Sequence, residues 1–232
     1  MAPPLVGTVT IGQAPRPDVT PILEAHLPAG TACLQAGVLD GLDAAAISAR
    51  FGHRPGDRLL VTRLLDGTAV RLDAHRVEGA LRERVAWLDA QGCRLVVVLC
   101  TGTFEGLACD RAFLLEPDRL IPPAVAAVVG TRPLGVIVPD AAQASSEAGK
   151  WGVLATPPRV AAASPYDGND AALRAAAHRL ADDGVSVIVL DCIGFTEHHR
   201  RVAATASGLP VLLSNAIVAR IAGEWVAAYA PR

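Results

Sequence analysis

The feature that most limits the fold of this chain is the alternation of short β-forming runs with longer Ala-, Leu- and Arg-rich runs. The runs LVVVL at 95–99 and VIVL at 187–190 are continuously apolar, which is typical of strands covered on both faces. The runs between them have the composition and the start and stop residues of helices. Strands that alternate with helices predict an α/β fold built on parallel sheets.

The sequence patterns give approximate bounds for these elements. The expected strands are Leu5–Ile11, Arg94–Leu99, Leu134–Val138, Val185–Leu190 and Pro210–Leu213, with weaker candidates at Thr31–Gln35 and Arg159–Ala163. The expected helices are Asp18–His26, Asp73–Gln91, Pro122–Val129, Ala141–Leu154, Asn169–Asp183, Glu197–Ser207 and Asn215–Ala228.

Two segments interrupt the regular alternation. Asp57–Leu72 holds two alternating runs around Asp66-Gly67, which predicts a β-hairpin added to the α/β plan. Leu115–Pro123 contains three prolines that we expect to interrupt regular structure, so it is a candidate crossing between domains.

Composition limits the kind of ligand. The chain has 232 residues, enough for one large or two small α/β domains with a buried core. Its 21 Lys and Arg residues nearly balance its 23 Asp and Glu residues, which argues against nucleic acid or an anionic membrane as the main partner. We therefore expect a small-molecule ligand.

The location of the protein and the state of its thiols follow from what the sequence lacks. No segment reads as a secretory signal or approaches the roughly 18 apolar residues of a membrane span, so we expect a cytoplasmic protein. The cysteine count, five, is odd, and the spacing lacks the CxxC pairs of a structural zinc site. We interpret all five as free thiols.

Two cysteines occur in the same local pattern. Cys100 and Cys192 each end an apolar strand, and each is followed two residues later by a glycine. Parallel sheets bind ligands at the carboxyl ends of their strands. A thiol placed there before a helix start meets unpaired N–H groups and the positive end of the helix dipole, which favour a thiolate that can act as a base. The repetition hints at two similar halves, with one thiol from each facing a cleft.

The alternative for either cysteine is a buried packing role, because free cysteine is among the most buried residue types. The sequence alone leaves both interpretations open for Cys100 and Cys192. The remaining three, Cys33, Cys93 and Cys109, lack the strand-end context, so we interpret them as packing residues.

Polar groups accompany the first cysteine. In CTGTF, Thr101 and Thr103 supply hydroxyls and Gly102 leaves the backbone unobstructed, a combination that could hold a carboxylate or a developing oxyanion. The loop TIGQAPRPDV after the first strand opens on the same sheet edge. Thr10 and Gln13 are candidate ligand contacts there, and Arg16 is a weaker one.

The segment DCIGFTEHHRR has several potential metal ligands, namely Asp191, Glu197, His198 and His199. Adjacent histidines on a helix diverge by about 100°, which disfavours a metal site. One histidine or Arg200 could instead pair with a substrate carboxylate, or the helix face could simply be solvated; Thr196 is an expected N-cap.

One further strand-to-helix junction places Ser214 and Asn215 at a strand end, where they could cap the helix or contact a ligand. GTVTIGQ fits neither phosphate-binding glycine motif, so nucleotide cofactors are not indicated.

Several longer strings together resemble the AroM family, over about Val9 to Glu224. The strings are TIGQAPRPD, LEPDRLIPP, LGVIVP, KWGVL, LDCIGFTEHHR and PVLLSNAIVARIAGE. AroM proteins are similar to the superfamily of aspartate, glutamate and hydantoin racemases, which includes maleate isomerase and arylmalonate decarboxylase.

The resemblance implies two pseudo-symmetric α/β domains with four-stranded parallel sheets, a last helix that returns to the first domain, and no cofactor. We therefore expect domains at 1–131 plus 214–232 and at 132–213, with the hairpin in the first. Cys100 and Cys192 match the two catalytic positions. The matching substrate-binding positions are Thr10, Gln13, Thr101 and Thr103, with Ser214 and Asn215 as looser matches.

The main hypothesis is a cofactor-independent racemase or isomerase that acts on a small carboxylate by proton transfer with two cysteines. The racemases usually carry Asn-Thr after the first cysteine and a threonine after the second, whereas this chain has Thr101-Gly102 and Ile193. Alternatives are a one-cysteine decarboxylase, a cis-trans isomerase, or a small-ligand sensor without turnover. The substrate and the oligomeric state are left open, a homodimer included.

Overall fold

The computed structural model describes residues 4–144 and 149–229 and divides the chain into two compact units. Unit 1 comprises residues 1–117 and 218–232, and unit 2 comprises residues 118–217. The domain bounds expected from the sequence stay a prediction. Each unit is an α/β layer structure with its own parallel sheet, as the sequence pattern predicts.

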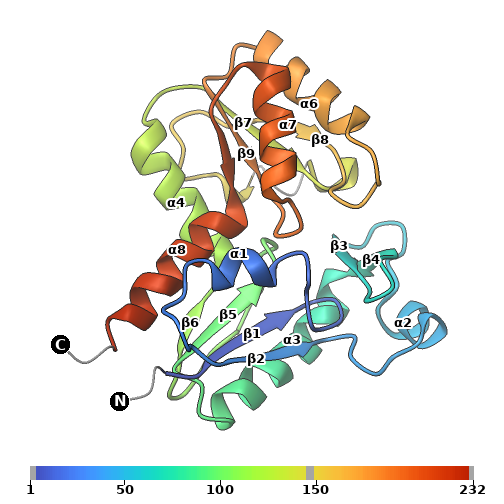
Figure 1. Ribbon diagram of the computed structural model, residues 1–232. Helices are drawn as coiled ribbons and strands as arrows, with labels where there is room; N and C mark the ends of the chain where they lie inside the picture. The colour runs from blue at the N-terminus through green and yellow to red at the C-terminus, as the bar shows by residue number, and fades with distance from the viewer. Residues whose placement is uncertain (1–3, 145–148, 230–232) are drawn as a thin grey trace. The chain divides into compact units, whose positions relative to one another are not determined.

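The sheet of unit 1 has four parallel strands in the order β2-β1-β5-β6 (Figure 1). Its strands are β1 (Val6–Thr10), β2 (Cys33–Gly37), β5 (Leu95–Leu99) and β6 (Phe113–Leu115). Every residue of β1 and β5 is buried, because these central strands are covered on both faces. Their register places Thr10 beside Leu99, so the carboxyl ends of both strands lie together.

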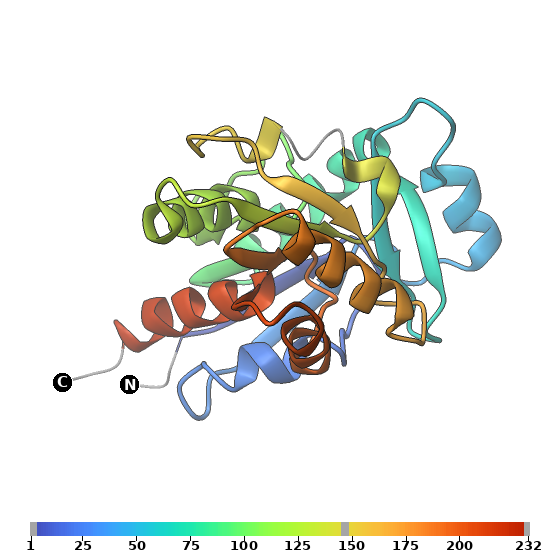
Figure 2. The same ribbon diagram turned by 90° about the horizontal axis from the view of Figure 1, so that it is seen from above.

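Three helices and the hairpin lie wholly within this unit. The helices are α1 (Thr20–Glu24), α2 (Ala44–Phe51) and α3 (Ala74–Ala90), and the hairpin pairs β3 (Leu59–Arg63) with β4 (Ala69–Asp73). The predicted hairpin is confirmed, since β3 and β4 are antiparallel. It lies beside α2 in both views (Figures 1 and 2). Asp73 ends the hairpin and starts α3, where its side chain accepts a 2.9 Å hydrogen bond from the N–H of His75.

The sheet of unit 2 also has four parallel strands, in the order β10-β9-β7-β8. Its elements are β7 (Leu134–Val138), β8 (Arg159–Ala162), β9 (Val187–Leu190), β10 (Val211–Leu213), α6 (Ala171–Asp182), α7 (Glu197–Ser207) and the 3-10 turn η1 (Ala141–Gln143). Two helices cross from one unit into the other, α4 (Pro117–Val129) and α8 (Ser214–Ala227).

The two sheets share one topology. When the four strands of each sheet are numbered in chain order, both sheets have the order second, first, third, fourth. The third strand is β5 in unit 1 and β9 in unit 2, and a Cys-x-Gly turn follows each of them. The repetition seen in the sequence therefore reflects a repeated fold.

Several elements differ from the sequence-based expectation. The patterns missed β6 and α2, which are only three and eight residues long. The expected helix at 141–154 is confirmed in part: residues 144 and 149–150 are helical, 141–143 forms η1, 151–154 forms a turn and a bend, and 145–148 lie outside the described residues. No helix in the described ranges has the length and apolar character to cross a membrane.

The prediction that prolines break the chain at Leu115–Pro123 is wrong. Pro117 is the first residue of α4, where a missing N–H costs nothing, and Pro122 and Pro123 lie inside the same helix. The boundary between the units falls at this helix start, between Pro117 and Asp118.

Candidate active site

The turn after β5 places a backbone donor on the sulfur of Cys100. The N–H of Gly102 donates to this Sγ at 3.4 Å, and the Cys100 side chain is buried in the core of unit 1. A Cβ at position 102 would lie 2.7 Å from Cδ2 of Leu60. The glycine therefore lets the chain turn tightly enough, beneath the hairpin, to aim its N–H at the thiol.

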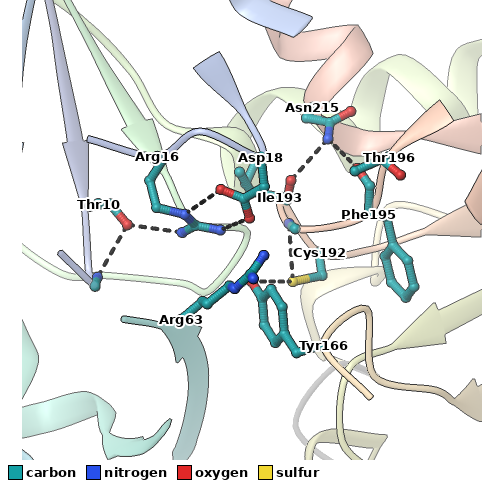
Figure 3. Close-up of polar contacts among 12 residues, drawn as sticks. Thr10, Arg16, Asp18, Arg63, Tyr166, Cys192, Ile193, Phe195, Thr196 and Asn215 are labelled. Atoms are coloured by element: carbon teal, nitrogen blue, oxygen red, sulfur yellow. Dashed lines mark hydrogen bonds and ion pairs between the residues drawn. The ribbon is translucent and has the colours of Figure 1, made fainter. Parts of the chain in front are cut away.

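The turn after β9 repeats this arrangement at Cys192. The N–H of Gly194 donates to Sγ at 3.5 Å, and the hydroxyl oxygen of Tyr166 lies 4.0 Å from the same sulfur (Figure 3). A Cβ at position 194 would lie 2.6 Å from Cζ of Tyr166. Here the glycine is needed because the aromatic ring occupies the space that any side chain would fill.

These contacts explain the Cys-x-Gly pattern and correct one expectation. Residues 100–112 form turns and irregular structure, so no helix start faces Cys100; α7 starts only at Glu197, five residues after Cys192. At each sulfur the structure shows a donor N–H two residues along the chain. A donor aimed at sulfur favours the thiolate, which is the form that can accept a proton from carbon.

The other three cysteines have the properties of packing residues. Burial, with the charge of Glu24 as a smaller cause, raises the pKa of the Cys33 thiol. Burial also raises the pKa of Cys93, and it raises the pKa of Cys109 to about 11, with Asp89 as the next cause. These thiols stay protonated near neutral pH.

Thr10 lies at the end of β1, and its hydroxyl is oriented by two donors. Its Oγ1 accepts hydrogen bonds from the N–H of Gly12 and from Nη1 of Arg16, both at 3.1 Å (Figure 3). Because both lone pairs of the oxygen accept hydrogen bonds, any further bond of this hydroxyl must be one in which its hydrogen is donated. Thr10 is thus suited to donate to a bound carboxylate.

Arg16 supports Thr10, and the anion contact considered from the sequence stays a prediction. Its guanidinium is buried and forms a two-pronged ion pair with Asp18, at 2.8 Å and 2.7 Å. The carboxylate of Asp18 neutralises the charge of Arg16 and fixes the orientation of the guanidinium, which donates a hydrogen bond to Thr10. Asp18, which the sequence did not single out, is therefore part of the support of Thr10.

Gln13 connects loops of unit 1. Its Nε2 donates to the carbonyl oxygens of Leu39 and Leu42, at 3.4 Å and 3.1 Å, and its Oε1 accepts from the N–H of Leu65 at 2.9 Å. The side chain joins the first loop to the hairpin turn. Its predicted ligand contact stays a prediction, beside this bracing role.

The backbone of the loop after Cys100 is held by the side chains of Arg58 and Glu78. Thr101 is buried, whereas Thr103 is exposed and its carbonyl oxygen accepts a 2.7 Å hydrogen bond from Arg58. Glu78 accepts from the N–H of Glu105 at 3.2 Å and also pairs with Arg58. The backbone of this loop is therefore fixed, and the ligand contacts predicted for the Thr101 and Thr103 hydroxyls stay a prediction.

Ser214 and Asn215 brace the turn that carries Cys192. Both are buried; Ser214 Oγ lies 2.9 Å from the carbonyl oxygen of Leu190. Asn215 donates from Nδ2 to the carbonyl oxygens of Ile193, at 2.9 Å, and of Phe195 (Figure 3). Their donors are used within unit 2, so a direct ligand contact by either residue stays a prediction.

The histidines of DCIGFTEHHRR serve the start of α7. Thr196 is the N-cap, as predicted, and its N–H donates to Nδ1 of His199 at 2.9 Å. Burial, followed by the charge of His198, lowers the pKa of His199. Nδ1 is therefore the acceptor nitrogen of a neutral ring. His198 Nε2 lies 3.0 Å from Asp170, and Arg200 pairs with Glu197 at 2.5 Å.

Two residues near Cys192 were missed by the sequence patterns. Tyr166 follows β8 at the carboxyl edge of the sheet, a position that the strand-end rule could have identified. Lys150 forms a buried ion pair with Asp191, for which the sequence carried no signal. Within the described part of the chain, no cluster of three His, Cys, Asp or Glu side chains is placed to hold a metal ion.

Solved structures share this fold at low sequence identity. Allantoin racemase from Pseudomonas fluorescens is 16% identical with a TM-score of 0.61, covering 97% of this chain and 91% of its own. Unliganded arylmalonate decarboxylase is 13% identical with a TM-score of 0.60, covering 98% and 94%. Glutamate racemase from Thermus thermophilus, solved with beta-chloro-D-alanine, is 19% identical with a TM-score of 0.60, covering 98% and 82%.

The sequence comparisons give the family. A search of curated proteins finds no match. The family model described as AroM protein matches residues 6–226, nearly the whole chain, and agrees with the motifs noted in the sequence. The chain therefore belongs to the AroM family, and it shares its fold with solved racemases of allantoin, aspartate and glutamate.

Proposed function

We propose that this protein is a cofactor-independent racemase or isomerase that moves a proton at the carbon next to the carboxylate of a small acid. The observation that carries the proposal is the equivalence of two turns. Cys100 and Cys192 follow the third strand of sheets with the same topology, and each sulfur receives an N–H from a glycine two residues on.

The proposed chemistry uses one sulfur on each face of the carbon. One thiolate takes the α-proton as the C–H bond breaks, and the bonding electrons move into the carboxylate to form an enediolate. The other thiol then gives its proton to the opposite face, so a C–H bond forms and that sulfur becomes the thiolate. The two cysteines exchange protonation states in each turnover.

Stabilisation of the enediolate falls to hydrogen-bond donors at the strand ends of unit 1. A carbon acid next to a carboxylate is weak, so fixed donors must face the charge that develops on its oxygens. Thr10, with its oriented hydroxyl, and the Thr101-Gly102-Thr103 turn are the proposed donors. Gln13 braces the first loop, Ser214 and Asn215 brace the Cys192 turn, and all three are the weaker candidates for direct contact.

The similar folds support this class of reaction without fixing the substrate. Racemases of allantoin and glutamate share the fold, and so does a decarboxylase. One-cysteine chemistry therefore remains the competing enzyme proposal, in which a single thiol protonates a decarboxylated intermediate or adds to an alkene. Carbon dioxide release or a cis-trans change in the product would identify it.

The direct test is deuterium incorporation at the α-carbon across a panel of amino, hydroxy and dicarboxylic acids in deuterated water. We expect exchange for at least one acid, and its loss in both Cys100→Ser and Cys192→Ser. Cys33→Ser is the matched control, because its thiol lies outside both turns and should leave exchange unchanged. Exchange that survives in both turn variants would remove the assigned roles, and ligand-induced thermal stabilisation without exchange would indicate a sensor.

A second test addresses whether both sulfurs can reach one substrate. In a variant with Cys33, Cys93 and Cys109 replaced by serine, a short bifunctional thiol reagent should join Cys100 to Cys192 within one chain. Substrate should protect against this reaction. Single-site modification alone, with the reagent's second arm hydrolysed, would argue against two-cysteine chemistry.

A further inference from the structure

A buried ion pair lies directly next to Cys192 in the chain. Nζ of Lys150 is 2.6 Å from Oδ2 of Asp191, and the side chains are 3% and 0% exposed. Lys150 comes from the segment after β7, whereas Asp191 follows β9 and immediately precedes the cysteine. Two ionised groups are therefore held in the interior beside the candidate catalytic thiol.

The carboxylate of this pair is fixed from several directions. Its Oδ1 lies 3.3 Å from Oγ of Ser214, and the backbone N–H of Asp191 donates to the carbonyl oxygen of Ile137 at 2.8 Å. The Asp191 side chain thus cannot turn toward solvent without breaking its contacts to Lys150 and Ser214, and β7 holds its backbone. Its negative charge stays one residue away from the sulfur.

We infer that Lys150 is a positioning residue for Cys192, whose ammonium cancels the charge of Asp191 so that a thiolate can form next to it. This inference rests on the proposed function in taking Cys192 as a working thiol. A buried carboxylate without a cationic partner would disfavour a second negative charge nearby. With Lys150 in place, the pair is neutral and the N–H of Gly194 can stabilise the thiolate.

Stability alone does not account for the pair. Removing two charges from water is costly, and apolar side chains of similar volume commonly stabilise an interior as well or better. Asn215 already holds the following residues of the turn through Ile193 and Phe195. An electrostatic effect on the Cys192 thiolate would explain why two charged residues occupy these buried positions.

Within unit 2, the structure places several titratable groups near this thiol. They include Asp191 and, through it, Lys150; Tyr166, whose oxygen is 4.0 Å from Sγ; and His199, whose ring packs edge-on against Phe195. His199 is held neutral by burial and by its role in capping α7. Lys150, at 2.6 Å, supplies a positive charge that balances Asp191.

The test is the pH dependence of Cys192 alkylation by iodoacetamide, followed by mass spectrometry of its peptide in the full-length protein. In Lys150→Met, the midpoint of the rate profile should rise by about 1 pH unit or more. In Lys150→Met/Asp191→Asn, a neutral pair of similar shape, the midpoint should return toward the wild-type value. Lys150→Arg should keep the wild-type midpoint, because it retains the charge.

The outcomes separate an electrostatic from a merely structural role. If Lys150→Met does not fold, Asp191→Asn alone decides the question, since loss of the carboxylate should lower the midpoint. Equal midpoints in all folded variants, or a double variant shifted as far as Lys150→Met, would overturn the inference. The readout needs no turnover, so a missing exchange reaction would count against the proposed function and leave this result intact.

Discussion

The hydroxyl oxygen of Tyr166 lies 4.0 Å from the sulfur of Cys192 (Figure 3), and its ring fills the space that a Cβ at Gly194 would need. The phenol and the Gly194 N–H approach one sulfur from different parts of unit 2. A thiol with two such donors nearby is better prepared to carry negative charge than a thiol that only fills a core.

Tyr166→Phe tests the contribution of this hydroxyl. The variant keeps the ring, so folding should be preserved, but the exchange rate should fall by about 10- to 100-fold, which corresponds to the ~1.5–3 kcal/mol of a hydrogen bond to a charged group. The chain has one other tyrosine, and Tyr229→Phe is the matched control. Equal exchange rates in the two variants would show that the hydroxyl takes no part.

Gly194→Ala tests whether the glycine exists to admit the tyrosine. Neither Gly194 nor Gly102 has a positive φ, so alanine is sterically excluded by neighbours and not by the backbone. At 194 the obstacle is a rigid ring, and we expect a loss of about 1–3 kcal/mol in the free energy of unfolding, together with a loss of exchange.

Gly102→Ala should cost less stability, because its obstacle is the end of the flexible Leu60 side chain. Gly79→Ala on α3 is the control: nothing lies within 4 Å of the added Cβ, and a helical alanine should stabilise by about 0.5–1 kcal/mol. Urea unfolding measures all three. A Gly194→Ala variant as stable as wild type would mean that Tyr166 can move aside freely.

Thiol labelling in the folded protein should divide the cysteines into two groups. With a pKa of about 11, Cys109 is a thiolate in roughly one molecule in a thousand at pH 8. The raised pKa values of Cys33 and Cys93 act in the same direction, so all three should remain unmodified by iodoacetamide at pH 8. Cys100 and Cys192 should be modified first. Peptide mass spectrometry after timed labelling measures the order, and early labelling of Cys109 would contradict it.

His199 should make stability depend on pH. Its pKa in the folded protein is lowered by burial, below the value of about 6.5 in the unfolded chain, so the unfolded chain binds more protons under mildly acidic conditions. Its stabilising contribution is therefore present above about pH 6.5 and is lost as the pH falls through the folded pKa.

Urea unfolding at pH 7.5 and pH 5.0 measures this effect. In His199→Gln, which keeps an acceptor for the Thr196 N–H, the difference in the free energy of unfolding between the two pH values should shrink. His178 is exposed on α6, and His178→Gln is the control: the difference in the free energy of unfolding between the two pH values should be the same as in wild type. An unchanged difference in His199→Gln would mean that its ring is protonated without penalty.

The sequence by itself determined the class of the fold and most of its elements. Continuous apolar runs such as Leu95–Leu99 can only be buried on both faces, and Asp66-Gly67 specifies a tight turn, so parallel sheets and a hairpin follow from local chemistry. The repeated Cys-x-Gly pattern likewise pointed to two equivalent strand ends. Short elements such as β6 were not predicted, because three residues are too few to show a periodic pattern of apolar and polar side chains.

Only the tertiary structure decided what each side chain does at those strand ends. Gln13 and Asn215 brace segments distant in sequence, and Arg16 pairs with Asp18 and holds Thr10; their ligand contacts stay predictions. Tyr166 and Lys150 acquired their importance in the same way. Hydrogen bonds and ion pairs depend on distances of a few ångströms between separate segments, which a local pattern of residues does not encode.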